Sequence, residues 1–130
     1  MVVDTSAVVA ILLREPEADS FAGMVVDSPL RVMSVVTRVE LSFVVEGRLR
    51  EAGRTDLEQL LRDLRIELAA VTPEQAEIAI EAFRRYGKGR HPAGLNIGDC
   101  FAYALAKATG HPLLFKGDDF AQTDIRPALT

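Results

Sequence analysis

The sequence contains very little cysteine and histidine, which limits the kinds of metal site that it can build. Its 130 residues include one cysteine, Cys100, and two histidines, His91 and His111. A lone cysteine cannot form an intramolecular disulfide, and so few cysteine and histidine ligands cannot make a zinc cage. Any metal ion bound by this chain must therefore be held by oxygen ligands.

A long apolar run is missing from the start of the chain. Only three apolar residues, Met1 to Val3, precede the charge of Asp4, and no basic region comes before them. A signal peptide or a membrane-spanning helix needs a much longer apolar stretch. We therefore expect a cytoplasmic protein with no membrane partner.

Positive charge is also scarce. The chain has 15 Lys and Arg residues against 19 Asp and Glu residues, a formal net charge of -4. Proteins that hold nucleic acid by bulk charge neutralise its phosphates with Lys and Arg, so this composition argues against that mode of binding. It leaves open a contact that a divalent cation mediates.

Length and patterning predict one α/β domain over residues 1–130. A chain of this size buries roughly two thirds of its unfolded surface in a single core, and no internal repeat divides it. Strands are predicted at 1–3, 30–34, 66–71 and 112–115, and helices follow Asp4, Glu17, Val35, Thr55, Thr72 and Asn96. This alternation, with few hairpin signals, favours a mostly parallel central sheet.

Short polar patterns set the expected starts of two of these helices. Thr55 and Thr72 stand three residues before Glu58 and Gln75, which is the pattern of a capping box, and Pro73 fits the first position of its helix. We therefore predict that helices start at these two threonines and end near residues 65 and 86.

Acidic residues stand at the ends of predicted strands and the starts of predicted helices. Asp4 follows the first strand, Asp118 and Asp119 follow the last, and Glu40 and Asp99 lie early on helices. In an open parallel sheet, functional sites lie beyond the carboxyl ends of the strands. All of these carboxylates can therefore converge at one edge of the sheet.

Glu40 has unusual neighbours on its predicted helix. It falls four residues after Val36 and three before Phe43, in a stripe of apolar positions at helical spacing that also includes Val39. A carboxylate within an apolar stripe needs a reason to be there.

Carboxylates gathered in one pocket repel one another unless a cation neutralises them. Hard oxygen ligands select Mg²⁺ or Mn²⁺. Because Mg²⁺ keeps several waters and prefers one or two carboxylates together with substrate phosphate oxygens, the chemistry that fits is phosphoryl or phosphodiester transfer. One or two such ions activate a water and stabilise the departing oxygen, so no nucleophilic side chain is required.

Each acidic residue also has an ordinary structural explanation. Asp4 and Asp99 can cap the helices that they begin, and Asn96 is placed to cap the second of these helices. Glu40 can reach solvent from a helix edge, and residues 118–119 can be a plain turn. Taken singly these explanations hold, but together they account poorly for so many acids at one edge.

Four sequence blocks surround these acids in order along the chain. They are Val3-Asp4-Thr5-Ser6-Ala7, Thr37-Arg38-Val39-Glu40-Leu41, Leu95-Asn96-Ile97-Gly98-Asp99-Cys100 with Tyr103-Ala104-Leu105-Ala106, and Leu113-Leu114-Phe115-Lys116-Gly117-Asp118-Asp119-Phe120. Together they resemble the PIN-domain family, and specifically the VapC-type toxins of bacterial type II toxin-antitoxin systems. The resemblance implies a three-layer α/β/α fold with a mostly parallel central sheet.

The resemblance also implies an activity, that of a ribonuclease that depends on Mg²⁺ or Mn²⁺ and hydrolyses RNA phosphodiester bonds with a metal-activated water. By this comparison Asp4 and Asp99 are the principal metal ligands, and Glu40 is a third acid that binds a second ion or orients the attacking water. Ser6 corresponds to a residue that hydrogen-bonds a ligand carboxylate or a metal-bound water.

The fourth acid is where the sequence departs from the family. Members often carry an acid three residues before the phenylalanine, and here that position is Gly117. Asp118 or Asp119 must therefore take its place, and both are candidates.

The resemblance implies partners as well as an RNA substrate. It implies a homodimer, and a cognate VapB-type antitoxin whose C-terminal segment covers the acidic groove in a heterotetramer or larger assembly. An arginine or lysine of the antitoxin at the acidic cluster would be a natural inhibitor, because it places a cation where the metal belongs.

Two other functions are compatible with parts of the sequence. A receiver-type phosphoacceptor domain has a similar size and an acidic pocket, and Lys116 matches its late lysine. That domain needs adjacent acids after the first strand, whereas here Thr5 and Ser6 follow Asp4. The second alternative is a PIN fold whose chemistry has lapsed, a non-enzymatic binding module, which the displaced fourth acid favours.

Overall fold

Four parallel strands form the centre of the molecule. The structure is a computed structural model that describes residues 1–128, and its strands are β1 (Val2–Val3), β2 (Val32–Ser34), β3 (Glu67–Ala69) and β4 (Leu113–Leu114). They lie in the order β3-β2-β1-β4, and each neighbouring pair is parallel. The prediction of a parallel sheet is confirmed, with strands shorter than expected.

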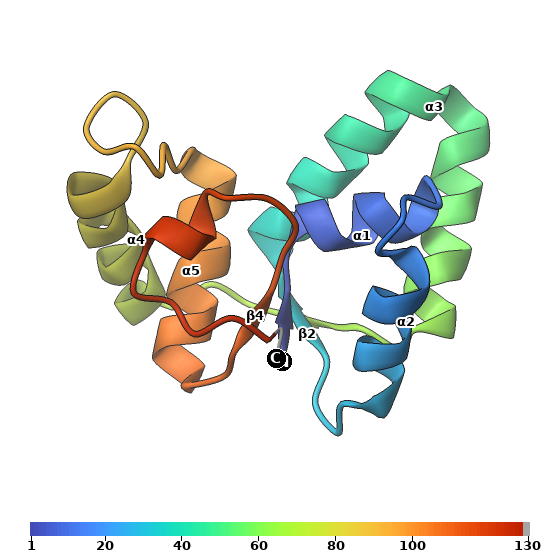
Figure 1. Ribbon diagram of the computed structural model, residues 1–130, viewed down its shortest axis with the longest axis horizontal. Helices are drawn as coiled ribbons and strands as arrows, with labels where there is room; N and C mark the ends of the chain where they lie inside the picture. Colours follow the sequence, from blue (N-terminus) through green and yellow to red (C-terminus); the bar gives the residue numbers. More distant parts are fainter. Residues whose placement is uncertain (129–130) are drawn as a thin grey trace.

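Helices cover both faces of this sheet (Figure 1). On one side lie α1 (Thr5–Leu12), α2 (Ala18–Asp27) and α3 (Val35–Asp63), and on the other lie α4 (Pro73–Tyr86) and α5 (Ile97–Thr109); a 3₁₀ turn, η1 (Phe120–Gln122), follows β4. The predicted three-layer α/β/α fold is therefore confirmed. Within residues 1–128, none of the helices combines the length and the apolar character needed to cross a membrane.

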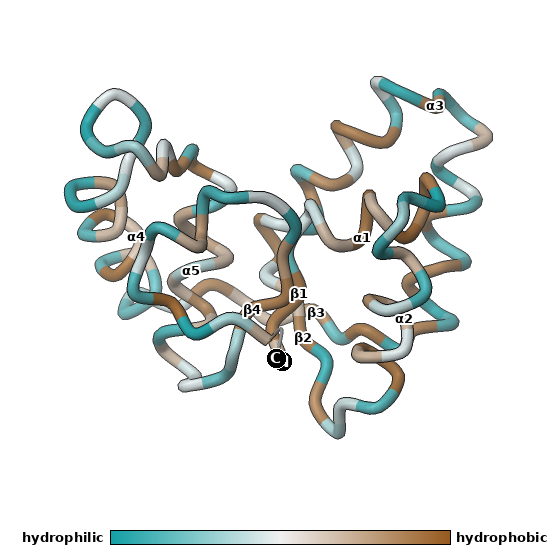
Figure 2. Tube along the Cα trace, viewed as in Figure 1, coloured by the Kyte–Doolittle hydropathy of each residue, from teal (hydrophilic) through white to brown (hydrophobic). Residues whose placement is uncertain are grey.

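Alternation along the short strands divides the core between the two sheet faces. Val2 and Leu113 pack with α4 and α5, whereas the next residues along, Val3 and Leu114, pack with α1, α2 and α3. All four side chains are completely buried. Figure 2 shows the strands as an apolar column between the helical layers. The strand ends, and the acids beside them, are thus held in place from both sides.

Helix α3 differs most from the prediction. It begins at Val35 and is broken at Arg50, where φ is 57°, so its two segments form a hairpin that rises from the sheet and returns (Figure 1). The predicted helix start at Thr55 is wrong, because the second segment resumes directly after the break. A glycine is required just after this break, because a β-carbon at Gly53 would lie 2.4 Å from Cβ of Leu49.

Two other helices follow the predicted local chemistry at their ends. The Thr72 hydroxyl accepts a hydrogen bond from the N–H of Gln75 at 3.1 Å, with Pro73 first in α4. The Gln75 side chain donates to the carbonyl of Ala70 instead of returning to Thr72, so only half of that capping box forms. α5 ends at Gly110, whose φ of 73° suits a glycine.

The face of α3 that packs on the core is not the apolar stripe around Glu40. The buried residues are Thr37, Leu41 and Val45, whereas Val39 is 50% exposed and Phe43 is 72% exposed. Both sets have helical spacing, so only contacts with the rest of the fold decide which set is buried. Glu40 itself is half-buried, at the border between core and surface.

Candidate metal centre

A pocket of about 380 Å³ lies beside the carboxyl ends of β1 and β4 and is lined largely by polar and acidic residues. Its lining consists of Asp4, Thr5, Ser6, Val9, Glu15, Glu40, Val44, Asn96, Asp99 and Lys116. The fold therefore brings together three of the acids singled out in the sequence, with Ser6 and Asn96 beside them. Asp118 and Asp119 do not line this pocket.

Asp4 is the most buried acid of the pocket. It follows β1 directly, its N–H donates to the carbonyl of Leu114 at 3.0 Å, and only 3% of the residue is exposed. One carboxylate oxygen, Oδ2, accepts hydrogen bonds from the Ser6 amide at 3.0 Å and the Ser6 hydroxyl at 2.7 Å, which caps α1. The other oxygen, Oδ1, is buried and has no hydrogen-bond partner within residues 1–128. Helix capping therefore accounts for Oδ2 of Asp4 but not for Oδ1.

Asp99 also caps a helix. The N–H of Asp99 donates to Oδ1 of Asn96 at 2.9 Å, and the N–H of Asn96 donates to Oδ2 of Asp99 at 3.1 Å, a reciprocal capping box. The cap predicted at Asn96 is thus confirmed. This arrangement fixes the half-buried Asp99 carboxylate on the first turn of α5, beside the pocket.

Glu40 is held from two sides by residues that the sequence alone did not mark. The Thr5 hydroxyl donates to Oε1 of Glu40 at 2.7 Å. On the other side Gly98 lies so close that a β-carbon there would be 2.0 Å from Oε2. Only a glycine permits this approach between α3 and α5. The available signals were the positions of Thr5 directly after Asp4 and of Gly98 directly before Asp99.

Crowding shifts the acid-base behaviour of the two aspartates in the same direction. Burial raises the pKa of Asp4 to about 6; hydrogen bonds from Ser6 oppose this shift, and the charge of Glu40 adds to it. Burial raises the pKa of Asp99 to about 7, and the charges of Asp4, Glu40 and Asp119 raise it further. A bound divalent cation would reverse both shifts, because it favours the charged carboxylates.

The acids of the pocket fit a hard cation that completes its shell with other ligands. Within residues 1–128, no three Asp, Glu, His or Cys side chains are arranged to hold a metal ion by themselves. Mg²⁺ is usually bound through one or two carboxylates, with waters and substrate phosphate oxygens in the remaining positions. The unpaired Oδ1 of Asp4 and the neighbouring Asp99 match that requirement, so these two residues could hold such an ion.

Lys116 is the one basic residue in the pocket lining. It follows β4 closely, and its N–H donates to Oγ of Ser6 at 2.9 Å. Its ammonium forms ion pairs with Glu15 and, at 2.9 Å, with Glu17, both between α1 and α2. These two carboxylates raise the pKa of Lys116. No local signal in the sequence reveals this cluster, because its members are brought together only by the fold.

Asp118 and Asp119 lie in the loop beyond the pocket, and both are exposed. Gly117 turns the chain just before them with a φ of 103°. The carbonyl of Asp119 accepts a hydrogen bond from the N–H of Gln122 at 3.3 Å, at the start of η1. The charge of Asp119 is one of the causes that raise the pKa of Asp99.

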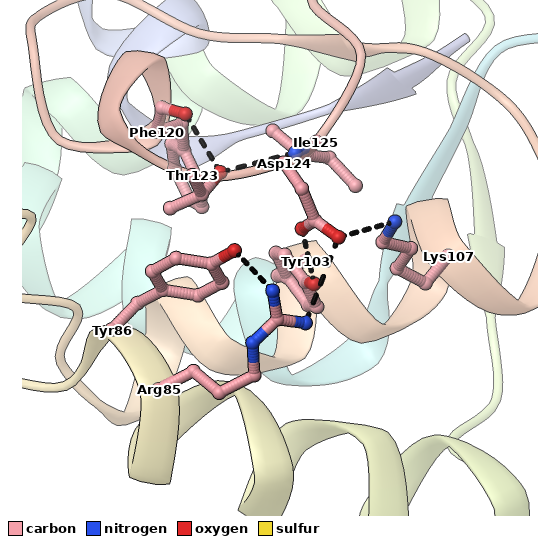
Figure 3. A network of polar contacts seen from close by, with 8 residues as sticks. All are labelled: Arg85, Tyr86, Tyr103, Lys107, Phe120, Thr123, Asp124 and Ile125. Atoms are coloured by element: carbon pink, nitrogen blue, oxygen red, sulfur yellow. Dashed lines mark hydrogen bonds and ion pairs between the residues drawn. The ribbon is translucent and has the colours of Figure 1, made fainter.

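Asp124 has very different surroundings on the side of α4 and α5 (Figure 3). Its carboxylate accepts a hydrogen bond from the Tyr103 hydroxyl and forms ion pairs with Lys107 at 2.9 Å and Arg85 at 3.7 Å. Burial alone would raise the pKa of Asp124, but these partners lower it below its ordinary value. The network ties the segment after η1 to both helices and supports the fold without entering the acidic pocket.

Comparison with known proteins shows the family to which this chain belongs. The family model described as PIN domain matches residues 1–126. The chain belongs to the PIN-domain family.

Relatives of this PIN domain cover nearly the whole chain. It is 53% identical over 125 residues to a protein named Ribonuclease VapC from Mycolicibacterium smegmatis, a match that covers 96% of this chain and 97% of the relative. It is 50% identical over 125 residues to Ribonuclease VapC30 from Mycobacterium tuberculosis, covering 96% of this chain and 95% of the relative. The resemblance to VapC-type proteins is therefore confirmed.

Solved structures share the fold of this PIN domain at low sequence identity. VapC20 of Mycobacterium tuberculosis, described as a toxin that cleaves the sarcin-ricin loop, matches with a TM-score of 0.76 and 15% identity over 95% of both chains. VapBC2 of Rickettsia felis, bound to a DNA fragment from its promoter, matches with a TM-score of 0.69 and 17% identity, covering 97% of this chain and 94% of that one. These likenesses agree with the three-layer architecture.

Proposed function

We propose that this PIN domain is a ribonuclease dependent on Mg²⁺ or Mn²⁺ and the toxin component of a type II toxin-antitoxin system. The observation that carries the proposal is Oδ1 of Asp4, which is buried without a hydrogen-bond partner among residues 1–128, close to the charges of Glu40 and Asp99. Helix capping leaves this oxygen unexplained, whereas a bound cation satisfies it. The relatives named as ribonucleases support the same chemistry.

The side chains of the pocket have distinct roles in this proposal. Asp4 and Asp99 would hold a divalent ion, which would supply a water of lowered pKa and stabilise the departing oxygen of the phosphodiester. The Ser6 hydroxyl donates to Oδ2 of Asp4 at 2.7 Å, and the backbone N–H of Asn96 donates to Oδ2 of Asp99 at 3.1 Å. Among residues 1–128 these contacts leave Oδ1 of each aspartate for the ion.

Glu40 acts on the attacking water. Thr5 occupies Oε1 of Glu40 with a hydrogen bond of 2.7 Å. Oε2 is then the atom that orients the water and accepts its proton. The close contact with Gly98 keeps this carboxylate at the first turn of α5, next to Asp99.

Cleavage of RNA by the purified protein tests the proposal. We expect cleavage that requires Mg²⁺ or Mn²⁺, stops with EDTA and falls by more than about 100-fold in Asp4→Asn or Asp99→Asn, because losing a direct ligand costs more than losing one of its supporting partners. Asp124→Asn makes the same chemical change outside the pocket and serves as the control. Unchanged cleavage in folded Asp4→Asn and Asp99→Asn proteins contradicts the proposal.

Asp119 is our proposal for the fourth acid. Its charge is one of the causes that raise the pKa of Asp99. We expect Asp119→Asn to reduce cleavage several-fold and Asp118→Asn to leave it unchanged. No loss in either variant or in the double variant removes both residues from the site.

A VapB-type antitoxin is the first partner that we propose. Exposed apolar side chains stand close in sequence to the pocket acids: Val39 is 50% exposed, Phe43 72% and Ile97 76%. An antitoxin segment with apolar side chains for this surface and an arginine or lysine for the acids would block the site. The assembly in the Rickettsia felis structure, named VapBC2, supports this pairing.

A second copy of the chain is the other partner that we propose. A groove of about 540 Å³ runs along α4 and α5, and its apolar lining includes Ile80, Phe83 and Phe101. Apolar surface of this kind is suited to a homodimer, which with the antitoxin would give a heterotetramer or larger assembly. Light scattering of the purified toxin should give the mass of a dimer, and a Phe83→Asp variant should give that of a monomer.

A further inference from the structure

Lys116 is a basic residue in a pocket that is otherwise acidic, and neither the family resemblance nor the metal chemistry assigns it a role. Four acids, Asp4, Glu15, Glu40 and Asp99, line the same pocket. We infer that the Lys116 ammonium binds a backbone phosphate of the RNA next to the metal centre, and that Glu15 and Glu17 hold it in position. This inference rests on the proposed ribonuclease function.

The geometry of Lys116 leaves one of its donors available. An ammonium has three N–H donors. Two of them are directed to Glu15 and Glu17, so among residues 1–128 the third is left for a ligand. The Lys116 side chain is 35% exposed, so a substrate can reach it from solvent.

Ser6 joins Lys116 to the most buried acid of the pocket. The Ser6 hydroxyl accepts a hydrogen bond from the Lys116 N–H at 2.9 Å and donates to Oδ2 of Asp4 at 2.7 Å. The backbone of Lys116 is therefore fixed relative to the Asp4 carboxylate. A phosphate oxygen that completes the shell of a cation at Asp4 enters the pocket that Lys116 also lines.

Electrostatics and side-chain entropy both favour phosphate binding by Lys116. RNA is a polyanion, so a phosphate that enters this acidic pocket needs a cationic group beside it, and the Lys116 ammonium, although paired with Glu15 and Glu17, keeps a 35% exposed side chain. A lysine that is already held by two carboxylates loses little side-chain entropy when it binds a phosphate. Lys116 also lines an adjoining hollow of about 410 Å³ with Ser20 and Gly117, which offers room for the nucleotide attached to that phosphate.

A purely structural role for the cluster predicts something different. If Lys116 only joins the turn between α1 and α2 to the end of β4, its removal changes stability but not the dependence of RNA binding on salt. A phosphate contact releases counterions, and losing one contact reduces the slope of log K against log salt by about 0.7 for single-stranded RNA. The salt slope therefore separates the two roles.

The experiment measures binding of a fluorescent single-stranded RNA at several salt concentrations, in an Asp99→Asn background in which cleavage is too slow to consume the RNA during the measurement. We expect Lys116→Met to lower the slope by about 0.7 and Lys116→Arg to restore it. Lys107→Met is the matched control, because its side chain is similarly exposed, 37% against 35%, and pairs with the carboxylate of Asp124 outside the pocket. Its slope should equal that of the background protein.

Cleavage assays and a second variant make the outcome decisive. With Asp99 intact, Lys116→Met should lower kcat/KM by about 10- to 100-fold, as expected for a lost hydrogen bond to a charged group. If this variant melts early, Lys116→Gln, which keeps N–H donors but no charge, should show the same lower slope. An unchanged slope, or an equal decrease in Lys107→Met, overturns the inference. If the wild-type protein does not cleave RNA, both the proposed function and this inference fail. If the wild-type protein cleaves RNA and the Lys116 variants keep its salt slope and its kcat/KM, only the inference fails.

Discussion

Asp99 and Asp124 are the same type of residue in opposite surroundings. Asp124 lies among two basic side chains and a tyrosine hydroxyl, and these partners lower its pKa despite partial burial. Asp99 lies near the charges of Asp4 and Glu40, and burial together with those charges raises its pKa to about 7. One carboxylate is neutralised within the chain, and the other has acids as its neighbours.

The difference separates a part of the molecule that supports the fold from the part to which we assign the proposed function. The contacts of Asp124 stabilise its charged form and connect the segment after η1 to α4 and α5. Burial favours the neutral forms of Asp4 and Asp99 instead, so the charges of these two residues reduce stability at neutral pH. A fold retains such a cluster where something outside the chain completes it.

Asp4→Asn tests the largest expected effect, which is the loss in free energy of unfolding caused by the buried negative charge of Asp4. Because the folded pKa of about 6 lies above the ordinary value of 3.8, the folded protein binds this proton more tightly than the unfolded chain does. The proton contributes its whole stabilisation when the pH is below the pKa of Asp4 in the unfolded chain. This stabilisation is lost as the pH rises through the pKa of Asp4 in the folded protein. The shift corresponds to about 3 kcal/mol.

Urea unfolding in the absence of divalent ions measures this effect. At pH of about 7.5 we expect Asp4→Asn to be more stable than wild type by up to about 3 kcal/mol, and near pH 4 the difference should vanish. A variant that is less stable than wild type at neutral pH contradicts the comparison, because it would mean that the Asp4 charge is already compensated within the chain.

Gly98→Ala tests how tightly the pocket is built. Helix propensity alone favours alanine by about 1 kcal/mol, but the new β-carbon would meet Oε2 of Glu40 at 2.0 Å and displace it. A displacement of this order should lower the rate of RNA cleavage by up to about 100-fold. Gly23→Ala and Gly47→Ala are matched controls, since nothing lies within 4 Å of a β-carbon at either position. If all three variants keep full activity, the position of Glu40 is not important.

Asp124→Asn tests the other half of the comparison and has the smallest expected effect. The variant loses its ion pairs with Lys107 and Arg85, and the side chain is 39% exposed. We expect a loss of about 1 kcal/mol in the free energy of unfolding and no change in RNA cleavage. A large loss of activity with unchanged stability would give this network a role in the site that our account does not include.

Short-range chemistry explains which parts of the fold the sequence could predict. The reciprocal cap between Asn96 and Asp99 depends on two residues three positions apart, and it forms as expected. Pro73 and Thr72 likewise start α4. The order of strands and helices was predictable because each element carries its own apolar pattern, and the parallel sheet follows from their alternation.

Long-range packing explains what the sequence could not predict. The capping pattern at Thr55 is locally sound, but the break at Arg50 lets the helix resume earlier. The apolar residues around Glu40 have helical spacing, yet the buried face is a different one because α3 packs on α1 through Leu41 and Val45. The contacts of Lys116 with Glu15 and Glu17 join residues about a hundred positions apart, which no local pattern encodes.

Melting temperatures with and without Mg²⁺ test most directly whether a cation completes the acidic pocket. An ion that binds only the folded protein stabilises it, and it competes with protons for Asp4 and Asp99, whose pKa values are about 6 and about 7. We predict that Mg²⁺ raises the melting temperature of the wild type, more at pH of about 8 than at pH of about 5, and does not raise that of the Asp4→Asn, Asp99→Asn double variant. The same response to Mg²⁺ in both proteins, or no response in the wild type, would contradict this account.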